Sequence, residues 1–168
     1  EIAQCLVGSE MCIRDRNNDI QFIWQTGKYY YPQVTEAVRA AGELPNLYVT
    51  DFIKDMAAAY AASDLVISRA GAGSISEFCL LHKPVVLVPS PNVAEDHQTK
   101  NALALVDKQA AIYVKDSEAE AKLMDVALNT VADDRKLKEL SENIAKLALP
   151  DSARIIAQEV IKLAEAEN

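Results

Sequence analysis

The chain has 168 residues, of which 50% are hydrophobic, and a formal net charge of -8. This length and composition fit one globular domain with a substantial core, and the acidic balance without a Lys/Arg cluster argues against nucleic acid or an anionic membrane surface as a partner. No apolar run approaches the roughly 20 residues that span a bilayer. The cysteines at positions 5, 12 and 79 show neither a disulfide framework nor zinc-ligand spacing and suit a reducing cytosol.

Residues 1–16 do not fit any regular pattern. The stretch CLVGSEMCIRDR, from Cys5 to Arg16, has neither strand nor clear helix periodicity, and it resembles translated adapter sequence that contaminates some environmental assemblies. We therefore interpret residues 1–16 as an anomalous, non-native segment and residues 17–168 as the domain. On this interpretation the first strand and its loop are missing, and the sheet lacks a central strand.

From residue 20 onward, short apolar runs alternate with helical patterns. The runs predict strands over 20–24, 47–49, 65–68, 85–88 and 111–114. The intervening patterns predict helices over 32–41, opened by Pro32, and over 55–62, 74–81 and 97–106. Strands of consecutive apolar residues indicate burial on both faces, and strand–helix alternation indicates a parallel sheet. The sequence therefore predicts an α/β, Rossmann-like domain with helices on both faces of a parallel sheet.

After about residue 117 the pattern becomes wholly helical. Helices are predicted over 118–131, 134–147 and, following Pro150, over 152–164. We expect these helices to wrap around the sheet.

The most informative segment is SRAGAGSISE, Ser68 to Glu77, which joins a predicted strand to a predicted helix. Gly71 and Gly73 let the backbone turn sharply and lie close to a ligand, and the N–H groups at the start of the helix favour an anion. The segment predicts a pocket for the diphosphate of a nucleotide or nucleotide-sugar. An ordinary turn explains it equally well, with Ser74 as the N-cap and Glu77 as its capping-box partner.

Ligands in a doubly wound sheet lie beyond the carboxyl ends of the strands, so two further loops matter. In Asp51-Phe52-Ile53, a backbone amide and carbonyl can read the edge of a base, although a plain helix entry with a core aromatic at Phe52 is the simpler alternative. In residues 95–101, His97 and Gln98 offer donors and acceptors for a sugar ring, although helix capping explains the same polar run. Glu77, in the glycine segment, is placed to accept both hydroxyls of a ribose.

Other chemistries fit the sequence poorly. The glycine segment lacks the third glycine of a dinucleotide fingerprint, and neither a GxxxxGK[ST] loop nor a G-x-S-x-G elbow is present. His82, at a predicted helix end, is interpreted as a C-terminal cap. No Asp-x-Asp pair beside a strand end would hold magnesium against a diphosphate, so we predict no metal site and no required cofactor.

Two ordered stretches carry a resemblance to a known family. FIKDMAAAYAASDLVISRAGAGSISE (52–77) and KPVVLVPSPNVAEDHQTKNA (83–102), with Gln25-Thr26-Gly27-Lys28 upstream, resemble the C-terminal half of the MurG family of peptidoglycan N-acetylglucosaminyltransferases. The resemblance covers roughly residues 17–168. It implies the C-terminal half of a two-domain GT-B glycosyltransferase, which binds UDP-N-acetylglucosamine.

The resemblance also implies roles for individual residues. The backbone of Ile53 would read uracil, and Glu77 would bind the ribose. Gln98, and less firmly His97 where other members carry glutamine, would recognise the N-acetylglucosamine. The remaining predicted donor-binding residues belong to the loop against ribose and diphosphate and to the helix that follows: Ala72, Gly73, Ser74, Ile75 and Ser76.

The family's second glycine-rich phosphate loop and its N-terminal half have no counterpart in residues 17–168, so we assign no catalytic residue and expect the chain alone not to catalyse transfer. The implied reaction is inverting transfer to a lipid-linked acceptor bound by the other half, which also makes the membrane contact. The implied location is peripheral, at the cytoplasmic face of the bacterial cell membrane. A divalent ion such as Mg²⁺ is expected at most to stimulate the full enzyme.

Two other functions remain open at this point. The first is a donor-binding subunit without activity of its own, similar to the small half of two-chain dolichol-linked N-acetylglucosamine transferases. The second is one half of a UDP-sugar epimerase, which would need acid and base groups in both halves.

Overall fold

The computed structural model describes residues 19–42, 44–92 and 96–166. The predictions of an anomalous segment at 1–16 and of a missing first strand fall on or before residue 18. They lie outside the described residues and stay predictions.

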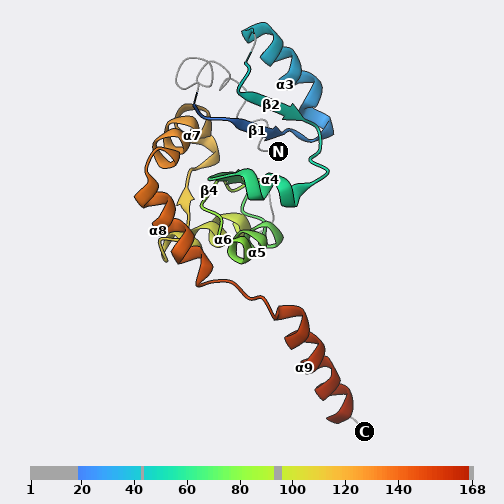
Figure 1. The fold of residues 1–168 in the computed structure, drawn as a ribbon. Coiled ribbons are helices and arrows are strands. Elements are labelled where there is room, and N and C mark those ends of the chain that lie inside the picture. The colour runs from blue at the N-terminus through green and yellow to red at the C-terminus, as the bar shows by residue number, and fades with distance from the viewer. Residues whose placement is uncertain (1–18, 43, 93–95, 167–168) are drawn as a thin grey trace.

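Strands and helices alternate along the described chain and give way to three successive helices, as the sequence predicts (Figure 1). The strands are β1 (Phe22–Gln25), β2 (Leu47–Thr50), β3 (Val66–Ser68), β4 (Val85–Leu87) and β5 (Ile112–Tyr113). The helices are α3 (Gly27–Ala41), α4 (Met56–Ala62), α5 (Ala72–Leu81), α6 (His97–Val106), α7 (Asp116–Val131), α8 (Asp134–Ala145) and α9 (Ser152–Ala166).

All described strand pairs are parallel, which confirms the predicted strand direction. β1 pairs with β2, and β3, β4 and β5 pair in that order, so the described strands form two groups. Among the described strands, β1 and β3 each pair on one side only. In the doubly wound order 3-2-1-4-5-6 the strands at these two places flank the first strand. The strand predicted to be missing would lie between these two edges, and its absence stays a prediction.

Helices cover both faces of the β3-β4-β5 group. On one face Val85 and Leu87 pack with Phe78 of α5, Leu105 of α6 and Ile144 of α8. On the opposite face Val86, Val88 and Val114 pack with Ala119 and Leu123 of α7. Consecutive residues of β4 therefore enter different clusters and are fully buried on both sides, which is the reason for its uninterrupted apolar sequence.

The predicted helix opened by Pro32 is wrong in its start, because α3 begins at Gly27 and contains Pro32 inside it. Gly27 has a φ of 73°, which lets the chain turn directly from β1 into the helix. Proline removes one helical hydrogen bond, but Tyr30, Val34 and Val38 recur at helical spacing and pack on Trp24 of β1. Packing of this face outweighs the local effect of the proline.

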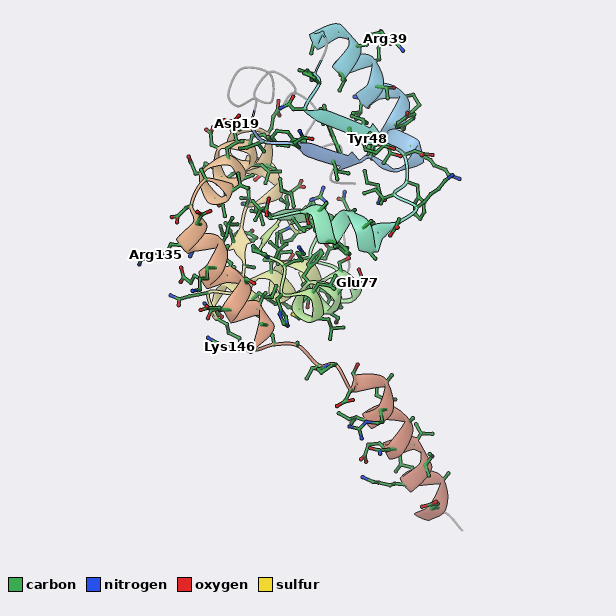
Figure 2. The ribbon with its side chains drawn as sticks, in the orientation of Figure 1. Asp19, Arg39, Tyr48, Glu77, Arg135 and Lys146 are labelled. Carbon is green, nitrogen blue, oxygen red and sulfur yellow. The ribbon has the colours of Figure 1, made fainter. Side chains whose placement is uncertain are left out.

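The prediction that the last helix wraps the sheet is also wrong. α9 projects away from the rest of the chain, and its side chains extend from an isolated helix (Figures 1 and 2). Ile155, Ile156, Val160, Ile161 and Leu163 are 49–68% exposed. α7 and α8 do pack against the domain. Within the part of the chain that the structure describes, no helix is long and apolar enough to cross a membrane.

Candidate functional site

Hydrogen bonds from the end of β1 and from within the loop itself fix the loop after β2. The Thr50 hydroxyl donates to the carbonyl of Phe52 at 3.1 Å, and the backbone N–H of Ile53 donates to Oε1 of Gln25 at 2.8 Å. The side chain of Phe52 is 62% exposed. The alternative of a core aromatic at this position is therefore wrong, and the loop presents Phe52 to solvent beside the Ile53 backbone.

The glycine segment forms the start of α5. Gly71 is the N-cap residue in an extended conformation and makes no side-chain cap, and the Ile75 N–H donates to the Gly71 carbonyl at 3.0 Å. Because that is the first intrahelical bond, the N–H groups of Ala72, Gly73 and Ser74 precede the helical hydrogen-bond ladder, at the positive end of the helix dipole. The capping-box alternative is wrong, since Ser74 lies inside the helix. The segment therefore forms a helix start of the kind that can bind an anion.

The next two predicted site residues have partners within α5. Ile75 packs against the core cluster that contains Phe78, so its side chain is turned from the loop surface. The Ser76 hydroxyl donates to the Ala72 carbonyl at 3.0 Å. Any role of Ile75 in ligand binding would therefore rest on its backbone.

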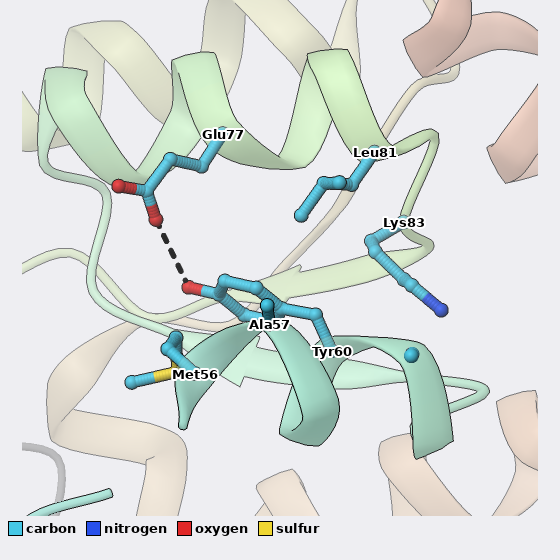
Figure 3. Close-up of a pocket in the computed structure, with 7 residues that line it drawn as sticks. Met56, Ala57, Tyr60, Glu77, Leu81 and Lys83 are labelled. Atoms are coloured by element: carbon cyan, nitrogen blue, oxygen red, sulfur yellow. Dashed lines mark hydrogen bonds between the residues drawn. The ribbon is translucent and has the colours of Figure 1, made fainter. Parts of the chain in front are cut away.

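Glu77 directly follows Ser76 in α5, and its side chain points toward α4 (Figure 3). Its Oε2 accepts a hydrogen bond from the hydroxyl of Tyr60 at 3.2 Å, which leaves Oε1 for other donors. Both residues line a cavity of about 510 Å³ between the two helices, together with Met56, Ala57, Ala61, Leu81 and Lys83. Burial raises the pKa of Tyr60, and the neighbouring Glu77 carboxylate raises this pKa further. Tyr60 therefore remains a hydrogen-bond donor at neutral pH.

We expect Tyr60→Phe to weaken UDP binding, because the substitution frees the carboxylate that Tyr60 orients. The loss should be smaller than that of a direct hydrogen bond to a charged group, about 0.5–1.5 kcal/mol, because Tyr60 acts on the ligand only through Glu77, and Phe retains the edge-to-face contact with Phe78. Calorimetric titration with UDP measures the effect. An unchanged dissociation constant would show that Tyr60 does not position Glu77 for a ligand.

Gln98 connects the loops that follow β3 and β4. Its Oε1 accepts hydrogen bonds from the backbone N–H of Ala70 at 3.2 Å and of Ser90 at 2.9 Å. Asn101, one turn further along α6, donates to the Ala70 carbonyl at 3.1 Å. These contacts occupy the carboxamide oxygen of Gln98 and leave its NH₂ group as the donor for a ligand. His97 is exposed at the first position of α6.

Arg69 connects the carboxyl ends of β3 and β4 to the start of α7. Its guanidinium donates to the carbonyls of Val88 and Pro89 at 3.1 and 3.2 Å and pairs with Asp116. Asp116 lies in the first turn of α7, where its negative charge also interacts favourably with the positive end of the helix dipole. No sequence pattern predicts this contact, since Arg69 and Asp116 lie 47 residues apart.

The structure thus joins elements that carry several of the predicted site residues. Gln98 touches the backbone just before the α5 helix start, and Glu77 is joined to α4, which follows the Ile53 loop. Gln25, Tyr60 and Arg69 also belong to this arrangement, and the sequence assigned none of them a role. No residue pattern within a single segment could have identified them, because each acts through a distant partner.

Comparisons with a family model, with curated proteins and with solved structures show what the chain is similar to. The model of the family described as "Glycosyltransferase family 28 C-terminal domain" matches residues 1–156. A protein of Bacteroides fragilis named "UDP-N-acetylglucosamine--N-acetylmuramyl-(pentapeptide) pyrophosphoryl-undecaprenol N-acetylglucosamine transferase" is 77% identical over 164 residues, covering 98% of this chain and 43% of that relative. A protein of Phocaeicola vulgatus with the same name is 70% identical over 145 residues, covering 86% of this chain and 39% of its own length.

The crystal structure of Acinetobacter baumannii MurG is similar in fold. It superposes with a TM-score of 0.81 at 26% sequence identity, covering 95% of this chain and 48% of that chain. The chain therefore spans less than half the length of the curated relatives and of the solved structure to which it is similar.

Proposed function

Because this chain belongs to the family of glycosyltransferase family 28 C-terminal domains, we propose that it is the donor-binding part of an inverting hexosyltransferase. The donor is UDP-N-acetylglucosamine, and the acceptor is undecaprenyl-pyrophosphoryl-N-acetylmuramyl-pentapeptide, an intermediate of peptidoglycan synthesis. The observation that carries the proposal is the 77% identity, over 98% of this chain, to a relative named for that reaction. We place this function in residues 17–168, the range that the sequence predicts for the domain, while the family model itself matches residues 1–156.

The start of helix α5 supports a role for this chain in stabilising the diphosphate as it leaves the sugar. As the bond between the sugar and the diphosphate breaks, negative charge grows on the phosphate oxygens. The N–H groups of Ala72, Gly73 and Ser74 precede the first intrahelical bond of α5 and face such a charge without rearrangement. Preorganised donors stabilise the developing charge more than the ground state, and this difference lowers the barrier.

The ends of the donor are recognised on either side of that helix start. Ile53 reads uracil through its backbone, Glu77 binds the ribose hydroxyls, and the NH₂ of Gln98 donates to the sugar. His97 adds a second polar contact for the sugar. The acceptor hydroxyl attacks the anomeric carbon from the face opposite UDP. We assign the general base, the acceptor site and the contact with the cytoplasmic face of the membrane to a part that this chain does not span, since the chain covers 43% of the length of that relative.

Calorimetric titration of the 168-residue chain with nucleotides tests the donor-binding proposal. We expect UDP to bind more tightly than ADP, GDP or CDP, since the Ile53 backbone offers one donor–acceptor pair that suits uracil. UDP-N-acetylglucosamine should bind more tightly than UDP-glucose. Equal affinity for UDP and ADP would contradict the assignment of a uracil site, and affinity for neither would contradict donor binding altogether.

A further inference from the structure

The backbone amide assigned to the base already has a partner in this structure. The N–H of Ile53 donates to Oε1 of Gln25 at 2.8 Å, across 28 residues of sequence. The loop does not depend on this bond alone. The Thr50 hydroxyl holds the Phe52 carbonyl, and the hydroxyl of the buried Thr26 contacts the Thr50 carbonyl at 3.3 Å. The side chain of Gln25 can therefore move away from Ile53 while the other hydrogen bonds still hold the loop at the end of β2.

A glutamine carboxamide presents the same kind of acceptor as a pyrimidine carbonyl. Each offers a carbonyl oxygen that accepts hydrogen bonds of similar strength. The Ile53 N–H has one hydrogen, so it donates to one of the two oxygens at a time. The side chain of Gln25 is exposed, so rotation about its own torsions releases the amide without opening a core. The carbonyl of a base and Oε1 of Gln25 are thus alternative occupants of one donor.

We propose that Gln25 occupies the base-binding amide of Ile53 in the ligand-free protein and is displaced when uridine binds. This inference rests on the proposed function, in which Ile53 reads the base. Only molecules with Gln25 turned away can bind the base. The apparent affinity for a uridine nucleotide is therefore the intrinsic affinity multiplied by the fraction of such molecules. A hydrogen bond of ordinary net strength reduces it by about threefold to tenfold.

Two substitutions with opposite expected effects test the proposal. In Gln25→Ala the competitor is gone, so calorimetry should show UDP binding about threefold to tenfold more tightly than in the unsubstituted chain. In Gln25→Glu a charged acceptor holds the Ile53 N–H more strongly, so UDP should bind more weakly. Ribose 5-phosphate, which lacks the base, is the control ligand. Its affinity should not rise in Gln25→Ala, and its affinity in Gln25→Glu measures the effect of the added charge.

The outcomes separate this inference from the proposed function. If Glu77→Ala weakens UDP binding but Gln25→Ala leaves the affinity unchanged or lower, the uridine site stands and the displacement of Gln25 is wrong. If ribose 5-phosphate gains as much as UDP in Gln25→Ala, the competition does not involve the base, and the inference is again wrong. If UDP binds to none of the variants or the unsubstituted chain, the proposed function fails and the inference fails with it.

A spectroscopic measurement gives a second readout that does not depend on the variants folding. In a UDP titration followed by amide NMR, the backbone signal of Ile53 and the side-chain NH₂ signal of Gln25 should shift together, because one loses its partner as the other is released. A shift of the Ile53 signal with a stationary Gln25 signal would overturn the proposal.

Discussion

Replacing Gln98 with alanine should lower the free energy of unfolding by about 2 kcal/mol or more, since each buried donor left without an acceptor costs about 1–3 kcal/mol. The two donors are the backbone N–H groups of Ala70 and Ser90, which Oε1 of Gln98 accepts at 3.2 and 2.9 Å. Ala70 is 0% and Ser90 3% exposed, so water reaches neither readily. Urea unfolding of the two chains, monitored by circular dichroism, measures the difference.

Gln98→Glu is the matched control, because it keeps an acceptor for both amides and removes the NH₂ donor. We expect its free energy of unfolding to stay near that of the unsubstituted chain. Its preference for UDP-N-acetylglucosamine over UDP should fall, and taking the ratio of the two dissociation constants cancels any repulsion of the diphosphate. If the glutamate variant is as unstable as the alanine variant, the shared acceptor is not what holds the two loops. If the ratio does not change, Gln98 does not read the sugar.

The order of strands and helices could be predicted from the sequence because it depends on local patterns. Runs of apolar residues marked β3 and β4, and helical periodicity marked α6 at its observed bounds. The predictions were wrong where contacts between residues far apart in the sequence determine the structure. Pro32 indicated a helix start, but Tyr30, which precedes Pro32, packs against Trp24 and Val34, and α3 extends back to Gly27. Periodicity predicted α9 but could not tell whether another element covers its apolar face.

The candidate site could be predicted to the level of its loops and no further. The rule that ligands lie beyond the carboxyl ends of parallel strands selected the loops that carry the candidate site, and the glycines indicated the helix start. The hydrogen-bond partners of the site residues were not predictable, because they lie far away in sequence. Tyr60 and Glu77 are 17 residues apart, and Gln25 and Ile53 are 28 apart. Nothing in either segment signals the other.

Glu77→Ala should weaken UDP binding by about 1.5–3 kcal/mol, the usual worth of hydrogen bonds to a charged group, which is roughly a 10- to 150-fold change in the dissociation constant. The fold should tolerate the change. Glu77 is exposed, and Tyr60, whose hydroxyl donates to its carboxylate, keeps its packing against Phe78. Exposed substitutions away from buried networks alter stability by about 0.5 kcal/mol or less. Calorimetry with UDP and a parallel urea titration separate the two effects.

A modified ligand identifies which contact is lost. If the free oxygen of Glu77 accepts from the ribose, 2′-deoxyuridine diphosphate should bind the unsubstituted chain more weakly than UDP, whereas Glu77→Ala should bind the two ligands equally. Glu77→Gln should lie between them, because a carboxamide oxygen still accepts one hydrogen bond but carries no charge. This pattern is a double-mutant cycle between one side chain and one hydroxyl, so it isolates their interaction from any general loosening of the cavity between α4 and α5. A penalty for the deoxy ligand that persists in Glu77→Ala would place the ribose against another residue, even if UDP affinity falls.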